Sequence, residues 1–275
     1  AAAIALLCRL HPIVAGEAAL AQTFVTEDGY LMLTVARNLA TGLGLSVSAG
    51  EIATNGVQPL ATLLYALAYL AVDGDKTAGL IGVTLIGAAG AAAGFLALRA
   101  FVAVALRGDA PGRVWPLAAA TLWFVGPLPL LHTMNALETG LYVAAVAGAS
   151  VYFARLMERG APYARRDQIL FGLACGLVFL TRIDGAFLVT AFFLVRFVHV
   201  QATGRLGFAG AVREALPPGL ISLAVAAPWL IYNYWLFGSI VPTSGTAQSA
   251  SAAFGANAAM IPATLFETML PMLPI

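Results

Sequence analysis

Residues 77–105, TAGLIGVTLIGAAGAAAGFLALRAFVAVA, decide the fold, and Arg99 is the single charged residue among them. The stretch is longer than the roughly 20 apolar residues that a helix needs to cross the hydrocarbon core of a bilayer. In that core every backbone N–H and C=O group must be satisfied within the segment, as it is in a helix. The segment therefore predicts a membrane-spanning α-helix.

The composition of the whole chain extends this prediction. Of its 275 residues, 61% are hydrophobic and only 10% are charged, whereas a soluble domain carries about 25% charged residues. So few charges cannot cover a water-facing surface. The net charge of +1 gives no reason to expect a nucleic-acid partner. We expect an all-α polytopic membrane protein that is embedded in a lipid bilayer.

Further apolar runs predict the other spans of a single transmembrane module over residues 1–275. Two of these runs fall short of the length that a bilayer requires, so kinks or partial insertion are open there. The chain starts without Met and stops within an apolar run, and we interpret it as a piece of a longer protein. The expected spans are 1–16, 77–105, 114–132, 138–156, 168–181, 185–200 and 216–236, and an eighth over 258–275 is left open.

The distribution of Arg and Lys predicts the orientation. Connections on the cytoplasmic side of a membrane carry an excess of these residues, and here ten of the fourteen fall on one side. We therefore expect that side to face the cytoplasm, with the opposite side external to the inner or plasma membrane. The ten are Arg99, Arg107, Arg113, Arg155, Arg159, Arg165, Arg166, Arg196, Arg205 and Arg213.

This orientation requires residues 23–76 to form one external loop. Two amphipathic helices are predicted within it, at 27–42 and at 58–71, and both are expected to lie along the membrane interface. The first carries its polar residues on one face and has Met32, Val35, Ala36, Leu39 and Ala40 on the other. In the second helix the polar residues share one face and form a stripe of Gln58, Thr62, Tyr65 and Tyr69.

Four polar clusters from four loops fall on the external side. Polar groups near a membrane are costly, so they are candidates for function. Because the expected topology gathers all four at one face, they favour a single site there. The clusters are Glu27-Asp28, Asn135 to Glu138, Arg182 to Asp184, and Pro242 to Gln248.

Glu27 and Asp28 form the strongest candidate. Adjacent carboxylates can divide their tasks, one removing a proton while the other orients it or holds a metal ion. The alternative is structural, because acids favour the first turn of a helix and Thr26 would cap it. On a helical wheel Asp28 turns away from Glu27 toward the apolar side, which favours function over capping.

The second candidate combines Arg182 with Asp184. The two residues could simply pair with each other, or Arg182 could grip a phosphate through two parallel hydrogen bonds. Glu138 is a weaker candidate at the end of a span. Arg9 is expected either to snorkel to the surface or to assist in binding an anion.

Several short motifs occur in an order that resembles a known family. They are Glu27-Asp28-Gly29-Tyr30 followed by Ala36-Arg37-Asn38-Leu39 and Gly42-x-Gly44, then Thr54-Asn55-Gly56-Val57-Gln58-Pro59-Leu60, Met134-x-x-Leu137-Glu138-Thr139, Leu180-Thr181-Arg182-Ile183-Asp184-Gly185, and Gly238-x-x-Val241-Pro242. The ordered set is similar to the GT-C superfamily of polytopic glycosyltransferases. Within it, the set most resembles bacterial members that build the cell envelope, including mycobacterial arabinofuranosyltransferases.

The resemblance implies a GT-C-like module with a long first external loop that carries the two interfacial helices. It implies an inverting transfer of a sugar from a polyprenyl-phosphate donor to a hydroxyl of a glycan, lipid or protein acceptor, on the external (periplasmic) face. Asp28 and Glu27 would be catalytic, and either could hold Mg or Mn. The residues that would bind substrate or its phosphate are Arg182, Asp184, Glu138, Arg9, Gln58 and Asn55.

The chain departs from the family pattern in two places that matter. Glu27 stands where family members often have Asp, which leaves open whether Asp28 or Glu27 is the base. Gln248 stands where a lysine often follows the Val-Pro segment. Two other functions stay open, a transporter or flippase for a lipid-linked or polar substrate, and a non-catalytic membrane subunit. Transporters tend to show internal repeats and broken helices in matching positions, and the sequence shows no repeat.

Overall fold

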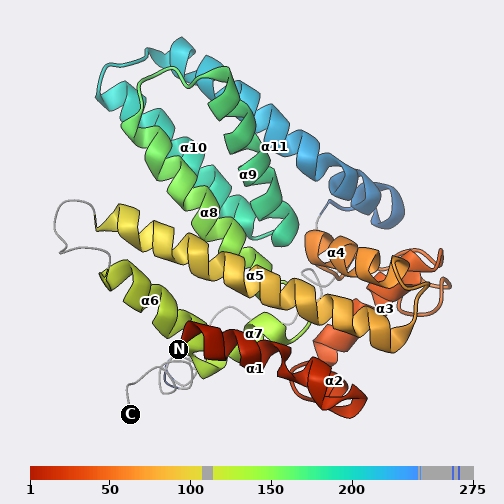
Figure 1. Cartoon of the computed structure of the whole chain (residues 1–275). Coiled ribbons are helices and arrows are strands. Elements are labelled where there is room, and N and C mark those ends of the chain that lie inside the picture. Colours follow the sequence, from red (N-terminus) through yellow and green to blue (C-terminus); the bar gives the residue numbers. More distant parts are fainter. Residues whose placement is uncertain (107–113, 241, 243–261, 263–265, 267–275) are drawn as a thin grey trace. The chain divides into compact units, whose positions relative to one another are not determined.

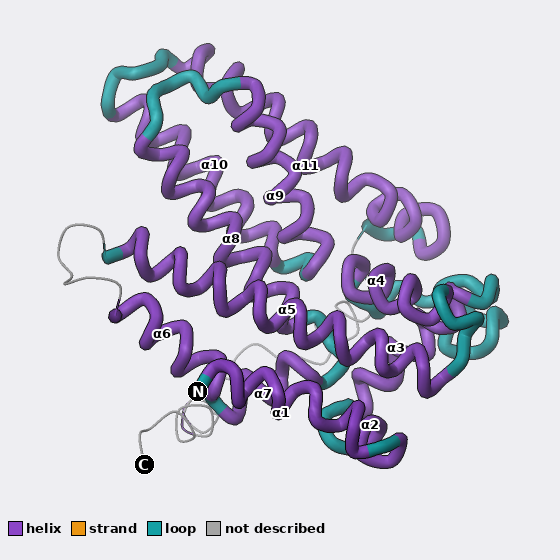
Figure 2. Tube along the Cα trace, in the orientation of Figure 1, coloured by secondary structure: helices purple, strands orange, loops and turns teal. Residues whose placement is uncertain are grey.

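The protein is all-helical in the computed structural model, which describes residues 1–106, 114–240, 242, 262 and 266 (Figure 1). Within these residues the chain forms eleven α-helices and no strand (Figure 2). A single isolated bridge joins Ser46 to Ala53 in the long loop between the third and fourth helices. The all-α prediction is therefore confirmed for the described chain.

Four helices are long and apolar enough to cross a membrane: α5 (Lys76–Ala105), α8 (Thr139–Glu158), α10 (Gly185–Ala202) and α11 (Phe208–Phe237). A fifth span is formed if α6 (Val114–Val125) and α7 (Pro127–Met134), which are bent by 63°, are taken together. Helices of this kind bury their apolar surface in lipid. The chain is a multi-pass membrane protein.

The predicted spans correspond to helices with shifted ends. The span at 77–105 is α5 to within one residue, whereas α11 begins eight residues before the predicted 216. The spans at 1–16 and 168–181 form shorter helices, α1 (Ala2–Ala15, 14 residues) and α9 (Arg165–Thr181, 17 residues). The eighth span at 258–275 lies outside the described residues, apart from Pro262 and Phe266.

The predicted span at 114–132 is broken at Gly126. Pro127 begins α7, and proline disfavours a helical conformation in the residue before it. Gly126 accordingly has an extended backbone with φ −60° and ψ 139°. Since proline also lacks the N–H that would continue the ladder of hydrogen bonds, one helix ends and another begins at a new angle.

Four of the described connections between helices lie in pairs at two ends of residues 1–229. At one end Arg182 contacts Glu138, which joins the α9–α10 loop to the α7–α8 loop. At the other end Arg205 Nη1 donates to the Arg159 carbonyl oxygen at 3.4 Å, which joins the loops after α8 and α10. Since the 20 residues of α8 are about 30 Å long, the two ends are well separated (Figure 1).

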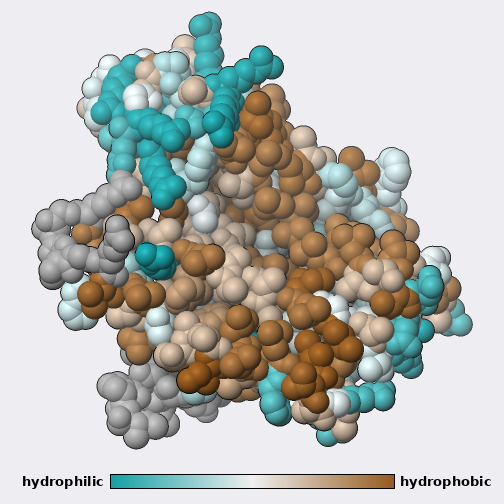
Figure 3. All heavy atoms as spheres, viewed as in Figure 1, coloured by the Kyte–Doolittle hydropathy of each residue, from teal (hydrophilic) through white to brown (hydrophobic). Residues whose placement is uncertain are grey.

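The surface agrees with this division. Hydrophilic residues cover the end that carries the loops after α8 and α10, and hydrophobic residues cover the helices next to it (Figure 3).

The contacts between residues divide the chain into two compact units, residues 1–229 and residues 230–275. In the described part of the second unit, Asn233 Nδ2 donates to the Ile240 carbonyl oxygen at 3.4 Å, just beyond the end of α11.

Both helices predicted in the loop at 23–76 are present, as α3 (Glu27–Ala40) and α4 (Pro59–Leu70). They pack against each other, against the short helix α2 (Glu17–Gln22) and against the start of α5, and they share one core. Their position along the membrane surface stays a prediction. The buried residues of this core are Leu20, Met32, Leu33, Ala36, Ala61, Tyr65, Ala66, Tyr69, Leu80, Val83 and Ala136.

Candidate functional site

The four residues 135–138, called the 135–138 turn, connect α7 to α8 and lie at the centre of the candidate site. The Asn135 side-chain oxygen accepts a hydrogen bond from the Leu137 amide at 3.0 Å, which closes a tight turn. Ala136 is buried and has φ 63°, a left-handed conformation that is uncommon for a residue with a side chain. This bend leaves the carbonyl groups of Asn135 and Leu137 available to other elements.

The N-terminus of α3 docks on the first of these carbonyl groups. Thr26 donates to the Asn135 carbonyl oxygen from its amide at 3.5 Å and from its hydroxyl at 3.4 Å. The Thr26 hydroxyl also accepts from the Gly29 amide at 3.3 Å, as a helix cap does. A Cβ at Gly29 would overlap the Asn135 carbonyl oxygen, so only glycine permits this approach. The docking holds Glu27 and Asp28 beside the turn.

Helix α4 binds the second carbonyl group. The Tyr65 hydroxyl donates to the Leu137 carbonyl oxygen at 2.8 Å, and only 1% of Tyr65 is exposed. Burial raises the pKa of Tyr65, so its hydroxyl stays protonated and keeps donating. The polar stripe that the sequence shows on this helix therefore faces into the protein.

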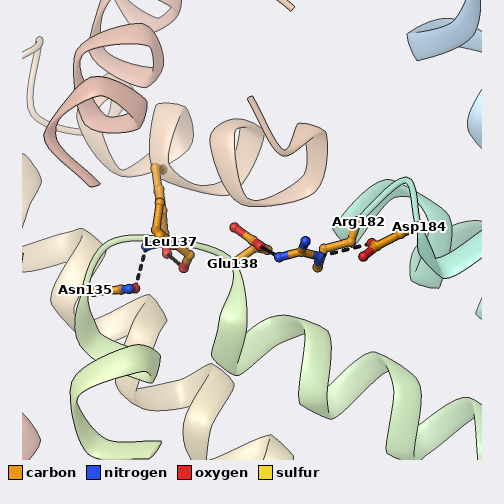
Figure 4. A network of polar contacts seen from close by, with 6 residues as sticks. Asn135, Leu137, Glu138, Arg182 and Asp184 are labelled. Atoms are coloured by element: carbon orange, nitrogen blue, oxygen red, sulfur yellow. Dashed lines mark hydrogen bonds and ion pairs between the residues drawn. The ribbon is translucent and has the colours of Figure 1, made fainter. Parts of the chain in front are cut away.

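Arg182 reaches the last residue of the turn from the loop between α9 and α10 (Figure 4). Its Nη1 lies 2.7 Å from Glu138 Oε1 and its Nε lies 3.0 Å from Asp184 Oδ1. Its guanidinium also lies over the ring of Tyr142, 5.6 Å from the centroid. The hydrogen bond to Asp184 is the main cause that raises the pKa of Arg182, so the guanidinium stays charged.

The two carboxylate partners of Arg182 differ in exposure. The side chain of Glu138 is 5% exposed, and that of Asp184 is 53% exposed. A buried partner fixes the position of the guanidinium, because separating the pair would leave a buried charge without compensation. An exposed partner contributes little and can be displaced by another anion. Glu138 thus fixes the position of the Arg182 guanidinium, which stays accessible on the side that contacts Asp184.

The carboxylates of Glu27 and Asp28 are both exposed, and no side chain in the described chain forms an ion pair with either. Asp28 stands four residues before Met32 and seven before Val35 on α3, in the register that the helical wheel predicts, but its side chain is exposed. Asp28 lies in the first turn, and the buried face begins only at Gly29 and Met32. Arg182 is paired with Glu138 and Asp184 and not with this acidic pair, although all of them surround the 135–138 turn.

Arg9 is not on the surface, so the prediction that it snorkels is wrong. It is fully buried, with its Nε and Nη2 each 3.4 Å from the Thr133 hydroxyl and its guanidinium 4.1 Å from the ring centroid of Phe124. Because Thr133 precedes the 135–138 turn by two residues, Arg9 supports the turn from the side of α1. A phosphate has no access to it in this arrangement.

Asn55 and Gln58 lie in the segment that leads into α4. Asn55 is 1% exposed, and Gln58 is half-buried at the position before the first residue of the helix. They lie next to α4, whose Tyr65 contacts the turn. The fourth polar cluster, from Pro242 to Gln248, lies outside the described residues apart from Pro242.

Among residues 1–106 and 114–240, no group of three or more His, Cys, Asp or Glu side chains is arranged to hold a metal ion. Glu27 and Asp28 offer two carboxylates, and Mg²⁺ is commonly bound by one or two carboxylates together with waters and substrate phosphates. The residues present therefore fit a cation that the substrate helps to bind.

Sequence reasoning missed two members of the site. Tyr142 lies under Arg182, and its spacing of four residues from Glu138 on one helix was a usable signal. The close approach of Gly29 to Asn135 had no such signal, because it joins segments more than a hundred residues apart. No protein-family model matches the chain, and neither a curated protein nor a solved structure matches it.

Proposed function

We propose that this chain is the membrane module of a glycosyltransferase with a GT-C-like architecture. It would move a sugar from a polyprenyl-phosphate donor to an acceptor hydroxyl with inversion, on the external face of the inner or plasma membrane. The acceptor would be a glycan, a lipid or a protein. The motif order described above is what links the chain to this class.

One observation supports the proposal most. An exposed pair of carboxylates and an accessible guanidinium are both anchored on the same four-residue turn, the carboxylates through Thr26 and the guanidinium through Glu138. Transfer from a phosphate leaving group needs a base for the acceptor and positive charge for the phosphate. Anchoring both on one turn fixes them relative to each other.

The reaction assigns a role to each group. The acceptor oxygen forms a bond to the anomeric carbon while the bond from that carbon to the phosphate oxygen breaks. Asp28 or Glu27 takes the proton of the acceptor hydroxyl, and polyprenyl phosphate leaves as an anion. Arg182 stabilises the charge that grows on the phosphate, which raises turnover and not only binding.

Asp184 has a different role from Glu138 in this scheme. The incoming phosphate replaces exposed Asp184 at the guanidinium, whereas buried Glu138 keeps Arg182 in place. If Mg or Mn binds, Glu27 and Asp28 would hold it, and it would add positive charge near the phosphate.

The experiment measures sugar transfer from polyprenyl-phosphate pentoses and hexoses by the chain in nanodiscs. We expect Asp28→Asn or Glu27→Gln to lower turnover at least about a hundredfold, the range for losing a general base. The matched control is Glu51→Gln, which neutralises an exposed carboxylate of the same external loop and should leave turnover unchanged. Near-normal turnover in both the Asp28→Asn and the Glu27→Gln variant would exclude these two residues as the base.

One observation favours the rival function of a transporter or flippase. The bent pair α6 and α7 is a broken span of the kind found around transporter substrate sites. The same nanodisc preparation can therefore be assayed for movement of a fluorescent polyprenyl-phosphate lipid between leaflets. Movement without sugar transfer, unaffected by Asp28→Asn, would replace the glycosyltransferase with the transporter.

A further inference from the structure

A polar cavity lies beside α3, at the edge of the apolar core that α2, α3, α4 and α5 share. It measures about 380 Å³, within the range of small-molecule sites. Its walls come from α2, one face of α3, the end of α4 and the start of α5. The polar residues that line it include Glu17, Tyr30, Thr34, Arg37, Tyr69 and Lys76.

We infer that this cavity binds a phosphate group, carried either by the headgroup of a membrane lipid or by a soluble phosphate ester. The inference does not depend on the proposed glycosyltransferase activity, because none of the residues assigned to that reaction lines the cavity. It depends on two cations, on the hydroxyl of a buried tyrosine and on the apolar part of the lining.

Arg37 is held in a fixed orientation. Its Nε donates to the Gly74 carbonyl oxygen at 2.6 Å, and Gly74 has φ 76°, which favours glycine. A Cβ at Gly74 would lie 2.6 Å from the Thr41 side chain, so a larger residue would displace this anchor. No side chain in the described chain accepts a hydrogen bond from Nη1 or Nη2 of Arg37, so this edge of the guanidinium can bind an anion in the two-pronged geometry that phosphate favours.

Lys76 supplies the second cation at the start of α5. Its side chain is exposed and has no described ion pair. The neighbouring Asp75 caps the helix, accepting from the Ala78 amide at 2.8 Å. The one carboxylate of the cavity lining belongs to Glu17, and it accepts from the Thr77 hydroxyl at 2.8 Å. The charged groups of the lining therefore sum to about +1, which favours an anion.

The hydroxyl of a buried tyrosine and several apolar side chains complete the cavity. Tyr69 is 4% exposed, and burial raises its pKa to about 12 despite the opposing charge of Arg37, so its hydroxyl remains a donor at neutral pH. Leu20, Leu33 and Leu80, which belong to the apolar core, form the apolar part of the lining. An anionic group bound between the cations would place its alkyl substituent against these side chains. A phosphate ester has both an anionic group and an apolar substituent, whereas a free sugar has no negative charge that the two cations could bind.

The test measures binding of inorganic phosphate to the full chain in non-ionic detergent by titration calorimetry. We expect saturable binding that Arg37→Gln weakens about ten- to a hundredfold, the value of hydrogen bonds to a charged group. Lys76→Gln should weaken it less, because an exposed charge contributes less. The control Arg166→Gln, at an exposed cation of α9, should bind like the unmodified chain.

Nanodiscs distinguish the two sources of phosphate. If an anionic lipid headgroup occupies the cavity, nanodiscs of phosphatidylglycerol will abolish binding of inorganic phosphate, and nanodiscs of phosphatidylcholine, whose choline cation offsets the phosphate charge, will not. If a soluble ester is the ligand, both nanodiscs will leave phosphate binding as it is in detergent. Absence of binding in detergent and nanodiscs alike, or equal binding by Lys76→Gln, Arg37→Gln and Arg166→Gln, would overturn the inference. Lys76→Gln keeps the test valid if Arg37→Gln fails to fold, because Lys76 has no described contact that folding requires.

Discussion

Helices α3 and α4 belong to the same loop, and both are amphipathic, but they bury opposite kinds of face. Helix α3 buries its apolar face, including Met32, Val35 and Ala36, and exposes Tyr30 and Thr34. Helix α4 buries its polar stripe. Thr62, Tyr65 and Tyr69 are 1%, 1% and 4% exposed, whereas Leu63, Leu67 and Leu70 are 50%, 60% and 57% exposed.

The difference shows that amphipathicity gives the period of a helix but not which face is buried. In water the apolar face turns inward because exposed apolar surface is costly. At a membrane the outside can be apolar, and a polar side chain is then stabilised by turning inward to a protein partner. Tyr65 has such a partner in the Leu137 carbonyl group, and the leucines of α4 are left to face the surroundings.

The largest effect is expected from Tyr65→Ala on the inward face of α4. Removing a fully buried aromatic side chain should cost about 3–5 kcal/mol of unfolding free energy through the cavity that it leaves. Tyr65→Phe keeps the ring and loses only the hydrogen bond to Leu137, for about 1 kcal/mol. SDS titration in mixed micelles measures both. Equal, small effects of the two variants would mean that the stripe is not packed in the core.

An intermediate effect is expected from Ala36→Leu on the inward face of α3. Ala36 has no exposed surface, and overpacking at such a position costs about 1–3 kcal/mol. Leu31→Met, at a residue that is 53% exposed on the same helix, is the control and should change little. The same SDS titration applies. A stable Ala36→Leu variant would show that α3 does not bury the face that both sequence and structure assign to it.

The smallest effect is expected from Leu67→Ala on the outward face of α4. Surface substitutions without a named packing role usually change stability by no more than about 0.5 kcal/mol. A loss of unfolding free energy as large as that of Tyr65→Ala would show that the outward face of α4 is packed as tightly as its inward face. The titration should be repeated in nanodiscs, where lipid replaces detergent around the leucines.

The parts of the fold that depend on local sequence could be predicted. The apolar run of α5 has uniform composition over its length, and its bounds were right to one residue. The break at Gly126 was missed, although the sequence Gly-Pro-Leu-Pro at 126–129 contains its cause. The burial of Arg9 could not be predicted, because it depends on contacts with Thr133 and Phe124, which are distant in the sequence.

The candidate site divides in the same way. That the loops at 135–138 and 182–184 share one end of the bundle follows from counting spans, and the contact between Glu138 and Arg182 agrees with it. Glu138 could not be predicted as a second partner of Arg182, because it is 44 residues away, whereas Asp184 is only two residues away. The adjacent partner was considered, and the buried one was not.

The short length of α4 has a consequence for how a lipid substrate would arrive. Its 12 residues extend for about 18 Å, less than the roughly 30 Å thickness of the hydrocarbon layer. If α4 lies along the interface as predicted, its exposed leucines face the acyl region on one side, and Tyr65 contacts the 135–138 turn on the other. In the function proposed above, the polyprenyl tail of the donor would then stay in the bilayer throughout a reaction cycle, and only the phosphate and the sugar would have to leave the lipid phase.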